Sequence, residues 1–567
     1  MDGASIIAKS IRDQGIEYVF GIVGIPIVEI SLALQAEDVK YVGMRNEQAA
    51  SYAASIIGYL TQRPAVCLVV PGPGVIHALA GIVNAQVNCW PLLVIGGSYD
   101  QDQVGMGGFQ ELPQVEAVSR YCKYATRLET LESIPYHIEK AVRTSTYGRP
   151  GVCYIDVPGN MITDAISEDK IRFCPRCLDA PFTLADPLAV RKACKVLSDA
   201  VRPLVIIGKG AAYAHAEEEI QEFVIRSNLP FLPTPMGKGV ISDTHPLCIA
   251  AARSKALAGA DVILLIGARL NWILHFGRPP RFNPNVKIIQ VDICAEEIGN
   301  SVPVHVMLNG HIKSVMKQLN EVMKNNPLKV SKSSQWWKDL SQKIGSNTRA
   351  NQLLAADKSL PMSFYCAYNE ICSLLPRNAI IVNEGSSTMD IGRTVLFNEL
   401  PRHRLDAGTF ATMGVGCGFA VAAALLSRDS STAEKERVVC IQGDSAFGFS
   451  GMEFETACRY QLPIIFIVMN NNGIYSGVDK ETWEGFLAEK DPTLSIAPTT
   501  LLHDAHYEKM ALAFGADGYY ASTPGELRQS IEKALQQKLK PVLINVSINP
   551  VSARRPQESS WLTKTKL

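Results

Sequence analysis

Residues 437–475 read RVVCIQGDSAFGFSGMEFETACRYQLPIIFIVMNNNGIY, and the first half of this stretch predicts a strand, a sharp turn and a helix. Residues 438–442 are a short apolar run, which is typical of a buried strand. The run leads into a Gly-Asp-Ser turn, and a helix is expected near residues 452–460. The carboxylate of Asp444 is therefore expected at the carboxyl end of a strand.

The second half of the stretch adds polar groups that suit a magnesium site. Residues 464–469 predict another buried strand, which ends in a run of asparagines that includes Asn471. If the two strands are parallel neighbours joined by the helix, Asp444 and Asn471 converge at one edge of the sheet, where open α/β sheets bind ligands. Proteins usually hold Mg²⁺ through one or two oxygen ligands plus phosphate oxygens. The amides of Ser445 and Ala446, in a turn leading to a helix, are expected to meet such a phosphate.

These residues together resemble the signature of thiamine diphosphate (ThDP) enzymes, in which Gly-Asp-Gly is followed further along by paired asparagines. Serine stands here where the third glycine is commonest, and this change removes no metal ligand. The resemblance implies that Asp444 and Asn471 bind Mg²⁺ through their side chains and Gly473 through its backbone carbonyl. It also places the loop after a strand at residues 380–382 beside the diphosphate. The cofactor contacts expected on this side of the molecule are Ser386, Gly443, Asp444, Ser445, Ala446, Asn471, Gly473 and Ile474.

Length and composition exclude several other classes of protein. A chain of 567 residues is too long for a single core and suggests three domains. Its 55 basic and 55 acidic side chains cancel, so the overall charge provides no attraction for nucleic acid or a membrane surface. No apolar run approaches the roughly 20 residues that span a bilayer, and the N-terminus lacks the features of a secretory signal.

The cysteines are expected to be free thiols. The 14 cysteines show no framework spacing, which suits a reducing compartment. Cys174 and Cys177 form a single close pair. A structural zinc needs two more ligands at suitable spacing, so we interpret this pair as incidental.

Hydrophobic patterning predicts three α/β blocks and a tail, at residues 1–165, 188–323, 355–548 and 549–567. Polar segments at residues 167–187 and 324–346 are interpreted as linkers. Doubly wound parallel sheets are the economical interpretation of all three blocks. By resemblance to the ThDP enzymes, the blocks are the pyrimidine-binding, central and diphosphate-binding domains. Buried strands are expected at residues 65–70, 92–96, 152–157, 204–207, 262–266, 287–292 and 542–546.

Glu47 stands at the expected start of an apolar helix, within the sequence Arg-Asn-Glu-Gln-Ala-Ala. On the residues alone, a glutamate in this position is a favourable partner of the helix dipole. ThDP requires a proton acceptor beside its aminopyrimidine ring, and in the family a glutamate within Asn-Glu-x-x-Ala has this role. The resemblance therefore implies that Glu47 is the catalytic acid–base group and that it contacts the cofactor.

Met413 lies in a run of small residues at positions 412–418. On its own it is interpreted as a core methionine that fills a gap. Members of the family place a large apolar side chain before such a glycine to hold the cofactor bent, and the resemblance implies this role for Met413. The glycines of the run do not complete G-x-G-x-x-G, so we exclude a dinucleotide fingerprint.

A Pro-Gly-Pro-Gly turn at residues 71–74 precedes the expected helix that carries His77. Such a turn either lets the backbone approach a ligand closely or only connects a strand to a helix. We interpret His77 first as a structural histidine and second as an acid or base.

Longer blocks of sequence resemble one branch of the family, which contains oxalyl-CoA decarboxylase and 2-hydroxyacyl-CoA lyase. These blocks are residues 267–272, 443–450, 452–460 and 471–475. The resemblance implies a reaction in which a carbon–carbon bond beside a thioester carbonyl breaks because the cofactor takes up the electron pair. Oxalyl-CoA would lose CO₂. A 2-hydroxyacyl-CoA would lose an aldehyde that is one carbon shorter and leave formyl-CoA.

Residues 107–111 favour the lyase. They place Phe109 and Gln110 where the decarboxylases usually show tyrosine and glutamate. A less polar pocket suits a long acyl tail better than a second carboxylate, whose burial without partners is unfavourable. Phe109 is also compatible with plain packing. Arg554 is interpreted as a clamp for CoA phosphates or as part of a mobile tail, and the expected substrate contacts are Phe109, Gln110, Tyr475 and Arg554.

Four charged residues resemble the site at which this branch accommodates a nucleotide portion, and in some decarboxylases ADP. Asp292 is expected at a strand end, where it can accept hydrogen bonds from ribose hydroxyls. Each of the four is also compatible with a solvated charge. They are Arg149, Lys209, Arg269 and Asp292.

The family binds each cofactor between the first domain of one chain and the third domain of another, which implies a homodimer or homotetramer. Glu47 and Asp444 of one chain would then serve different active sites. The chain ends in Thr-Lys-Leu, which is similar to the peroxisomal tripeptide Ser-Lys-Leu. This ending predicts a peroxisomal enzyme that engages an import receptor. A random ending would leave the enzyme cytoplasmic.

Two more distant functions stay open. One is acetohydroxyacid synthase, whose flavin would colour the purified protein. The other is a catalytically silent relative that serves as a partner or scaffold. The presence of Glu47, Asp444 and Asn471 argues against the silent relative.

Overall fold

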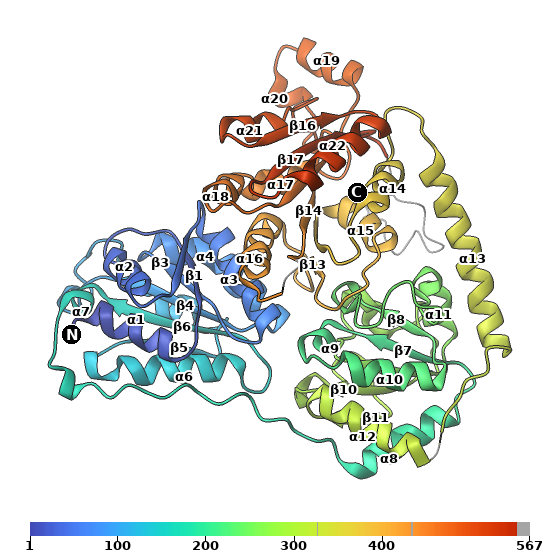
Figure 1. Ribbon diagram of the computed structural model, residues 1–567, viewed down its shortest axis with the longest axis horizontal. Helices are drawn as coiled ribbons and strands as arrows, with labels where there is room; N and C mark the ends of the chain where they lie inside the picture. Colours follow the sequence, from blue (N-terminus) through green and yellow to red (C-terminus); the bar gives the residue numbers. More distant parts are fainter. Residues whose placement is uncertain (326, 433–434, 553–567) are drawn as a thin grey trace.

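The computed structural model describes residues 1–325, 327–432 and 435–552, and within them three parallel sheets are each covered by helices (Figure 1). The expectation of three doubly wound parallel-sheet domains is confirmed. The strand orders are β2-β1-β3-β4-β6-β5 in the first sheet, β11-β10-β9-β7-β8 in the second and β13-β12-β14-β15-β17-β16 in the third.

The first sheet and its helices come from the N-terminal part of the chain. Its strands are β1 (Tyr18–Gly21), β2 (Lys40–Gly43), β3 (Val66–Val69), β4 (Leu92–Ser98), β5 (Tyr124–Arg127) and β6 (Val152–Pro158). Its helices are α1 (Gly3–Asp13), α2 (Val28–Ala36), α3 (Glu47–Thr61), α4 (Pro73–Asn88), α5 (Gln114–Ser119), α6 (Ile134–Thr146) and α7 (Gly159–Thr163).

The second sheet forms the central domain. Its strands are β7 (Pro203–Ile207), β8 (Phe231–Pro233), β9 (Val262–Ile266), β10 (Lys287–Asp292) and β11 (Val306–Asn309). Its helices are α8 (Pro187–Ser198), α9 (Lys209–Tyr213), α10 (Glu217–Ser227), α11 (Arg253–Gly259), α12 (Ile312–Asn325) and α13 (Gln335–Ala356).

The third sheet carries the stretch from which the fold was predicted. Its strands are β12 (Ile380–Glu384), β13 (Arg404–Asp406), β14 (Val438–Gly443), β15 (Ile465–Asn470), β16 (Asp517–Ala521) and β17 (Val542–Ser547). Its helices are α14 (Phe364–Leu374), α15 (Ser386–Val395), α16 (Val415–Asp429), α17 (Asp444–Ser450), α18 (Glu453–Arg459), α19 (Lys480–Ala488), α20 (Pro492–Ser495), α21 (Glu508–Ala513) and α22 (Pro524–Gln536).

Two details of the sequence interpretation are wrong. The polar segment 324–346 is not a linker throughout, because α13 begins within it and continues to Ala356. Ser334 caps the helix, and Trp336, Trp337 and Leu340 anchor its first turns in the core of the central domain. The rest of α13 is largely polar and continues toward the third domain along the edge of the molecule (Figure 1).

The second detail concerns the turn after β14. Instead of a loop before one helix near residues 452–460, the chain forms two short helices, and α17 begins at Asp444 itself. The carboxylate therefore lies in the first turn of a helix that directly follows a strand.

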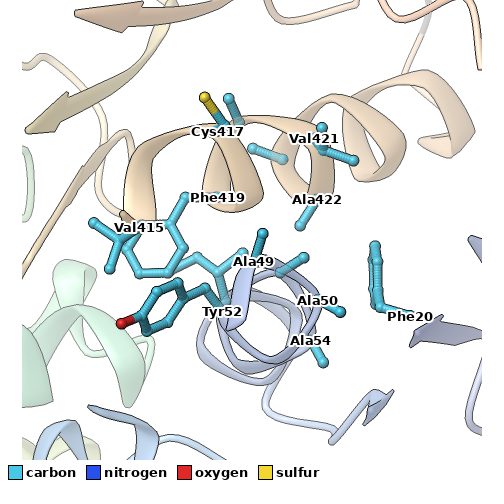
Figure 2. Packing of buried hydrophobic residues seen from close by; sticks show 14 of the residues in the cluster. Phe20, Ala49, Ala50, Tyr52, Ala54, Val415, Cys417, Phe419, Val421 and Ala422 are labelled. Atoms are coloured by element: carbon cyan, nitrogen blue, oxygen red, sulfur yellow. The ribbon is translucent and has the colours of Figure 1, made fainter. Parts of the chain in front are cut away.

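The first and third domains meet through helices α3 and α16, whose small side chains let the two helices approach closely (Figure 2). A Cβ atom on Gly418 would lie 2.6 Å from the carbonyl oxygen of Ala49. Tyr52 and Phe419 pack edge to face beside this contact, with ring centroids 6.3 Å apart. Because α3 begins at Glu47 and α16 follows Met413, this helix pair fixes the two segments relative to one another.

The 14 cysteines are all free thiols, including Cys174 and the buried Cys177. Among the described residues, no helix has both the length and the apolar character needed to cross a membrane.

Candidate active site

Asp444 joins the loops that follow two neighbouring strands. Strands β14 and β15 pair in parallel, so Asp444 and the asparagine loop after β15 lie at the same edge of the third sheet. One carboxylate oxygen of Asp444 accepts the Ser445 amide at 2.8 Å, and the other accepts the Gly473 amide at 3.0 Å. The Ser445 amide, which the sequence assigns to a phosphate, therefore already has a partner within the chain. Ala446 is buried in α17.

The polar groups at this edge fit a divalent cation. Asp444 is buried and has no cationic side chain as a partner among residues 1–325, 327–432 and 435–552. Burial raises the pKa of its carboxyl to about 6, against the hydrogen bonds that it accepts. The side-chain nitrogen of Asn471 donates to the carbonyl of Tyr475 at 3.2 Å, which leaves the Asn471 amide oxygen available as a ligand. A buried carboxylate without a counter-charge beside an available amide oxygen is the donor set that Mg²⁺ prefers.

The loop after β12 lies against the same edge. A Cβ atom on Gly385 would lie 3.2 Å from the Gly443 nitrogen, so the loops after β12 and β14 are in close contact. Gly385 has a φ of +105°, which favours glycine. It positions Ser386, an exposed residue at the start of α15, beside Gly443 and Asp444. Ile474 is also exposed and follows the asparagine loop.

Glu384, which the sequence analysis did not identify as a site residue, organises the loop that carries Met413. Its carboxylate is fully buried and accepts the backbone amides of Gly414, Val415 and Gly416 at the start of α16. The side-chain amide of Gln442 donates a fourth hydrogen bond at 2.6 Å. Burial raises the pKa of Glu384 to about 7.

Met413 immediately precedes this anchor. Its side chain is partly exposed, so Met413 is not a fully buried core residue. Gly414 has a φ of +95°, and a Cβ atom there would lie 3.3 Å from Phe449. One feature of the sequence could have identified Glu384 as the residue that anchors this loop. It is a charged residue at the end of a strand whose other residues predict burial.

Glu47 lies at the start of α3 with its side chain 11% exposed, and its closest charged neighbour is His77. The His77 Nδ1 atom lies 3.2 Å from the Glu47 Oε2 atom. The His77 side chain is 57% exposed, and its Nδ1 atom has Glu47 as a partner, so both the structural role and the acid or base role stay predictions. Both residues lie at the carboxyl edge of the first sheet, because α3 and α4 begin after strands β2 and β3.

The loop that carries Phe109 and Gln110 lies next to the start of α4. A Cβ atom on Gly72 would lie 2.7 Å from the Gln110 carbonyl oxygen. Glu111 organises the loop by accepting the amides of Gly105, Gly107 and Gly108 at 2.6, 2.7 and 3.1 Å. These hydrogen bonds hold the pKa of Glu111 below its ordinary value.

The two side chains of this loop differ in their surroundings. Phe109 is 65% exposed and is not a packing residue in this chain. The Gln110 Oε1 atom is buried and has no hydrogen-bond partner within the described part of the chain. The loop therefore combines an exposed apolar ring with a buried polar atom that has no partner within the described residues, next to the residue that precedes α4. Tyr475, the substrate contact predicted on the third domain, is also exposed. Its backbone has a φ of +73°.

The four residues assigned to a nucleotide line one cavity of about 820 Å³ between the three domains. Arg149 contacts Glu297 and Cys89, each at 3.0 Å. Burial raises the pKa of the Asp292 carboxyl. Lys209 is partly buried and contacts Asn88 and Thr409, and its desolvation, helped by Arg269, lowers its pKa to about 7. Lys209 is therefore a weaker source of positive charge than the sequence suggests. Arg554 and the C-terminal Thr-Lys-Leu lie outside the described residues.

Comparisons with known proteins agree with this geometry. Family models for the thiamine pyrophosphate enzymes match an N-terminal TPP binding domain at residues 1–117, a central domain at residues 190–319 and a C-terminal TPP binding domain at residues 384–546. The human 2-hydroxyacyl-CoA lyase 1 is 55% identical over 567 residues, which cover 100% of this chain and 98% of that protein. The protein of the same name from Dictyostelium discoideum is 42% identical over 98% of this chain and 99% of its own length.

Oxalyl-CoA decarboxylase of Escherichia coli strain K12 is a more distant relative. It is 38% identical over 99% of this chain and 97% of its own length. The chain therefore belongs to the thiamine pyrophosphate enzymes, in the group that contains the 2-hydroxyacyl-CoA lyases and oxalyl-CoA decarboxylase.

Proposed function

We propose that this protein is a carbon–carbon lyase that cleaves 2-hydroxyacyl-CoA to formyl-CoA and an aldehyde one carbon shorter, as in fatty acid α-oxidation. The observation that carries the proposal is full-length similarity to 2-hydroxyacyl-CoA lyases, at 55% for the human protein against 38% for the bacterial decarboxylase. The alternative is an oxalyl-CoA decarboxylase that gives formyl-CoA and CO₂.

ThDP and Mg²⁺ are proposed to bind at the carboxyl edge of the third sheet. Asp444, Asn471 and the Gly473 carbonyl hold the metal, and Ser386 and the turn at Gly443 face the diphosphate. Met413 supports the cofactor between its two ends, and Glu384 fixes that loop. The bound cofactor supplies a carbanion and an electron sink. Glu47 exchanges the proton that activates it.

Exposed apolar side chains near residues 105–109 support an acyl substrate. Val104, Met106 and Phe109 all face solvent, and Tyr475 does so on the third domain. A second carboxylate, as in oxalyl-CoA, would find no cation on the loop that carries Phe109. A long apolar tail gains free energy by covering these side chains.

The cavity between the domains is proposed to hold the nucleotide portion of CoA, or free ADP. Its volume of about 820 Å³ suits a nucleotide. Arg149 and Arg269 supply positive charge for phosphates, and Asp292 lies at the end of β10, where ribose hydroxyls can be bound.

The assembly is proposed to be a homodimer or homotetramer in which the first domain of one chain faces the third domain of its partner. Support comes from exposed apolar side chains at the carboxyl edges of both sheets, which a second copy would cover. They are Val23, Ile25 and Ile76 on the first domain, and Phe410, Phe449, Met452 and Ile474 on the third. The C-terminal Thr-Lys-Leu supports import into peroxisomes through its receptor.

The test is incubation of the protein with ThDP, Mg²⁺ and 2-hydroxyoctadecanoyl-CoA, followed by mass spectrometry. The expected products are formyl-CoA and the shortened aldehyde, and their formation should require ThDP. A parallel reaction with oxalyl-CoA is the control for the alternative. Release of CO₂ from oxalyl-CoA without cleavage of the 2-hydroxyacyl-CoA would favour the decarboxylase.

A further inference from the structure

We propose that His77 is the base that removes the proton from the 2-hydroxyl group of the substrate. This inference rests on the proposed lyase function. Cleavage of the bond beside a hydroxyl-bearing carbon needs an acceptor for the hydroxyl proton, whereas loss of CO₂ from a carboxylate does not. Glu47 is assigned to the cofactor, so the substrate requires a second group.

Helix packing brings His77 to Glu47. Helices α3 and α4 touch where Gly81 faces Ser51, since a Cβ atom on Gly81 would collide with the Ser51 hydroxyl. Glu47 lies one turn before Ser51 on α3, and His77 lies one turn before Gly81 on α4. Their side chains therefore meet, with 3.2 Å between Nδ1 and Oε2.

The contact fixes which nitrogen of His77 can act as a base. In the tautomer that we propose, Nδ1 donates to the Glu47 Oε2 atom, 3.2 Å away. The neutral ring then carries its lone pair on Nε2. Within the described part of the chain, Nε2 has no hydrogen-bond partner, and the side chain is 57% exposed. A base oriented by a third group is a recurrent catalytic arrangement.

The loop proposed to contact the substrate lies at the same place. The backbone of Gln110 touches Gly72, the residue that precedes α4, about one turn before His77. The buried Gln110 Oε1 atom lacks a partner within residues 1–325, 327–432 and 435–552. The exposed Phe109 ring lies on the same loop. We therefore propose that a substrate bound by this loop lies at the N-terminal end of α4, the helix that carries His77.

The proposed step balances without an oxidant or reductant. Nε2 takes the hydroxyl proton, and the electron pair of the O–H bond forms the carbonyl of the aldehyde. The bond between the hydroxyl carbon and the thioester carbon breaks, and its electron pair stays on the thioester carbon, where the bound cofactor delocalises it. His77 then returns the proton to that carbon, which becomes the C–H group of formyl-CoA.

The experiment compares His77→Asn, His77→Ala and Glu47→Gln with the wild-type holoenzyme. Asparagine keeps a donor near the Nδ1 position and removes the base at Nε2. Three quantities are measured: ThDP affinity by calorimetry, hydrogen–deuterium exchange at the thiazolium carbon, and cleavage of 2-hydroxyoctadecanoyl-CoA. The control is His305→Asn, an exposed histidine of the central domain.

We expect His77→Asn to lower the cleavage rate at least about 10²-fold, while ThDP affinity and the exchange rate stay within about threefold of wild type. Glu47→Gln should lose both exchange and cleavage. Because His77 is open to solvent, added imidazole should restore part of the activity of His77→Ala. His305→Asn should match wild type.

Three results would overturn the proposal: cleavage by His77→Asn within threefold of wild type, loss of exchange in parallel with cleavage, or no rescue of His77→Ala by imidazole. If the wild-type protein binds ThDP and exchanges its proton but cleaves no 2-hydroxyacyl-CoA, the proposed function fails and the role of His77 fails with it. If wild type cleaves the thioester and His77→Asn does so equally well, only the role of His77 is wrong.

Discussion

At the scale of single residues, the buried carboxyl of Asp444 makes the stability of the chain depend on pH. Burial raises the pKa of its carboxyl from the ordinary 3.8 to about 6. Ionisation at neutral pH therefore costs the folded state roughly 2–3 kcal/mol. Between about pH 4 and pH 6 the folded chain binds more protons than the unfolded chain, so the free energy of unfolding falls as the pH rises through this window.

The first prediction concerns Asp444→Asn without cofactor. Asparagine carries no charge, but it offers one oxygen to the two backbone N–H groups that Asp444 accepts. The prediction is therefore a trend with pH: the unfolding temperature of the variant relative to wild type should rise from pH 4.5 to pH 7.5, because only wild type ionises in this range. Addition of ThDP and Mg²⁺ should stabilise wild type but not the variant. Thermal unfolding by circular dichroism measures both effects, with the exposed Asp199→Asn as control. A stability difference between the variant and wild type that stays constant from pH 4.5 to pH 7.5 would contradict this account.

Glu384 gives the second prediction at this scale. Its two carboxylate oxygens accept four N–H groups, and glutamine would turn an NH₂ group toward some of these donors. We expect Glu384→Gln to lower the free energy of unfolding by about 1–3 kcal/mol and to weaken ThDP binding, because the Met413 loop loses its anchor. Denaturant unfolding and calorimetry test these effects, with the exposed Glu489→Gln as control. If the variant bound ThDP with unchanged affinity, Glu384 would have no role in cofactor binding.

At the scale of elements, helices α3 and α16 connect the two cofactor-binding domains through small side chains. Alanine and glycine dominate the contact, and the backbones approach closely. The interface has no space for further atoms. The distance between α3 and α16 is therefore short only because the side chains between them are small.

Gly418→Ala tests this spacing. The added methyl group would lie 2.6 Å from the Ala49 carbonyl oxygen and must push α3 away from α16. We expect a loss of about 1–3 kcal/mol in the free energy of unfolding. Gly485→Ala is the matched control, because it lies in helix α19 with nothing within 4 Å of the new methyl group, and it should be neutral or stabilising. Equal effects of the two substitutions would contradict the close packing.

The sequence predicts the elements best where burial is continuous. Strand β9 begins and ends where its apolar run does, because a central parallel strand is buried on both faces. Helix α13 was missed because only its first turns are anchored in a core, and the rest carries no apolar stripe.

The candidate site also divides into contacts that the sequence predicts and contacts that it does not. The meeting of Asp444 with the asparagine loop follows from two parallel neighbours in one sheet. The contacts of Glu384 with α16 and of His77 with Glu47 depend on how separate elements pack, which no local pattern encodes.

At the scale of the whole molecule, one cavity touches all three domains. Lys209 of the central domain contacts Asn88 of the first domain and Thr409 of the third. The Trp272 side chain also donates to the Thr409 carbonyl at 2.8 Å. Thr409 lies a few residues before Met413 in the chain. The segment that we propose supports the cofactor therefore begins in the wall of the proposed nucleotide site.

The proposed assembly predicts complementation between two inactive variants. Glu47→Ala and Asp444→Ala chains damage different halves of a site shared between subunits, so a mixed dimer should contain one intact site. Co-refolded variants should recover about a quarter of the wild-type activity, since half of the dimers are mixed and each mixed dimer has one of two sites intact. Native mass spectrometry verifies that mixed dimers form. No activity in verified mixed dimers would place Glu47 and Asp444 in the same site.

The loop held by Glu111, which we propose contacts the substrate, is separate from the contact between helices α3 and α16. Gly105 and Gly107 have nothing within 4 Å of a would-be side chain, and the loop depends on its own hydrogen bonds instead of on a core. Insertions and exchanges there leave the α3–α16 contact untouched. On the proposed role of this loop, natural or engineered substitutions in it can change which acyl chains the enzyme accepts. The residues proposed to carry out catalysis stay the same.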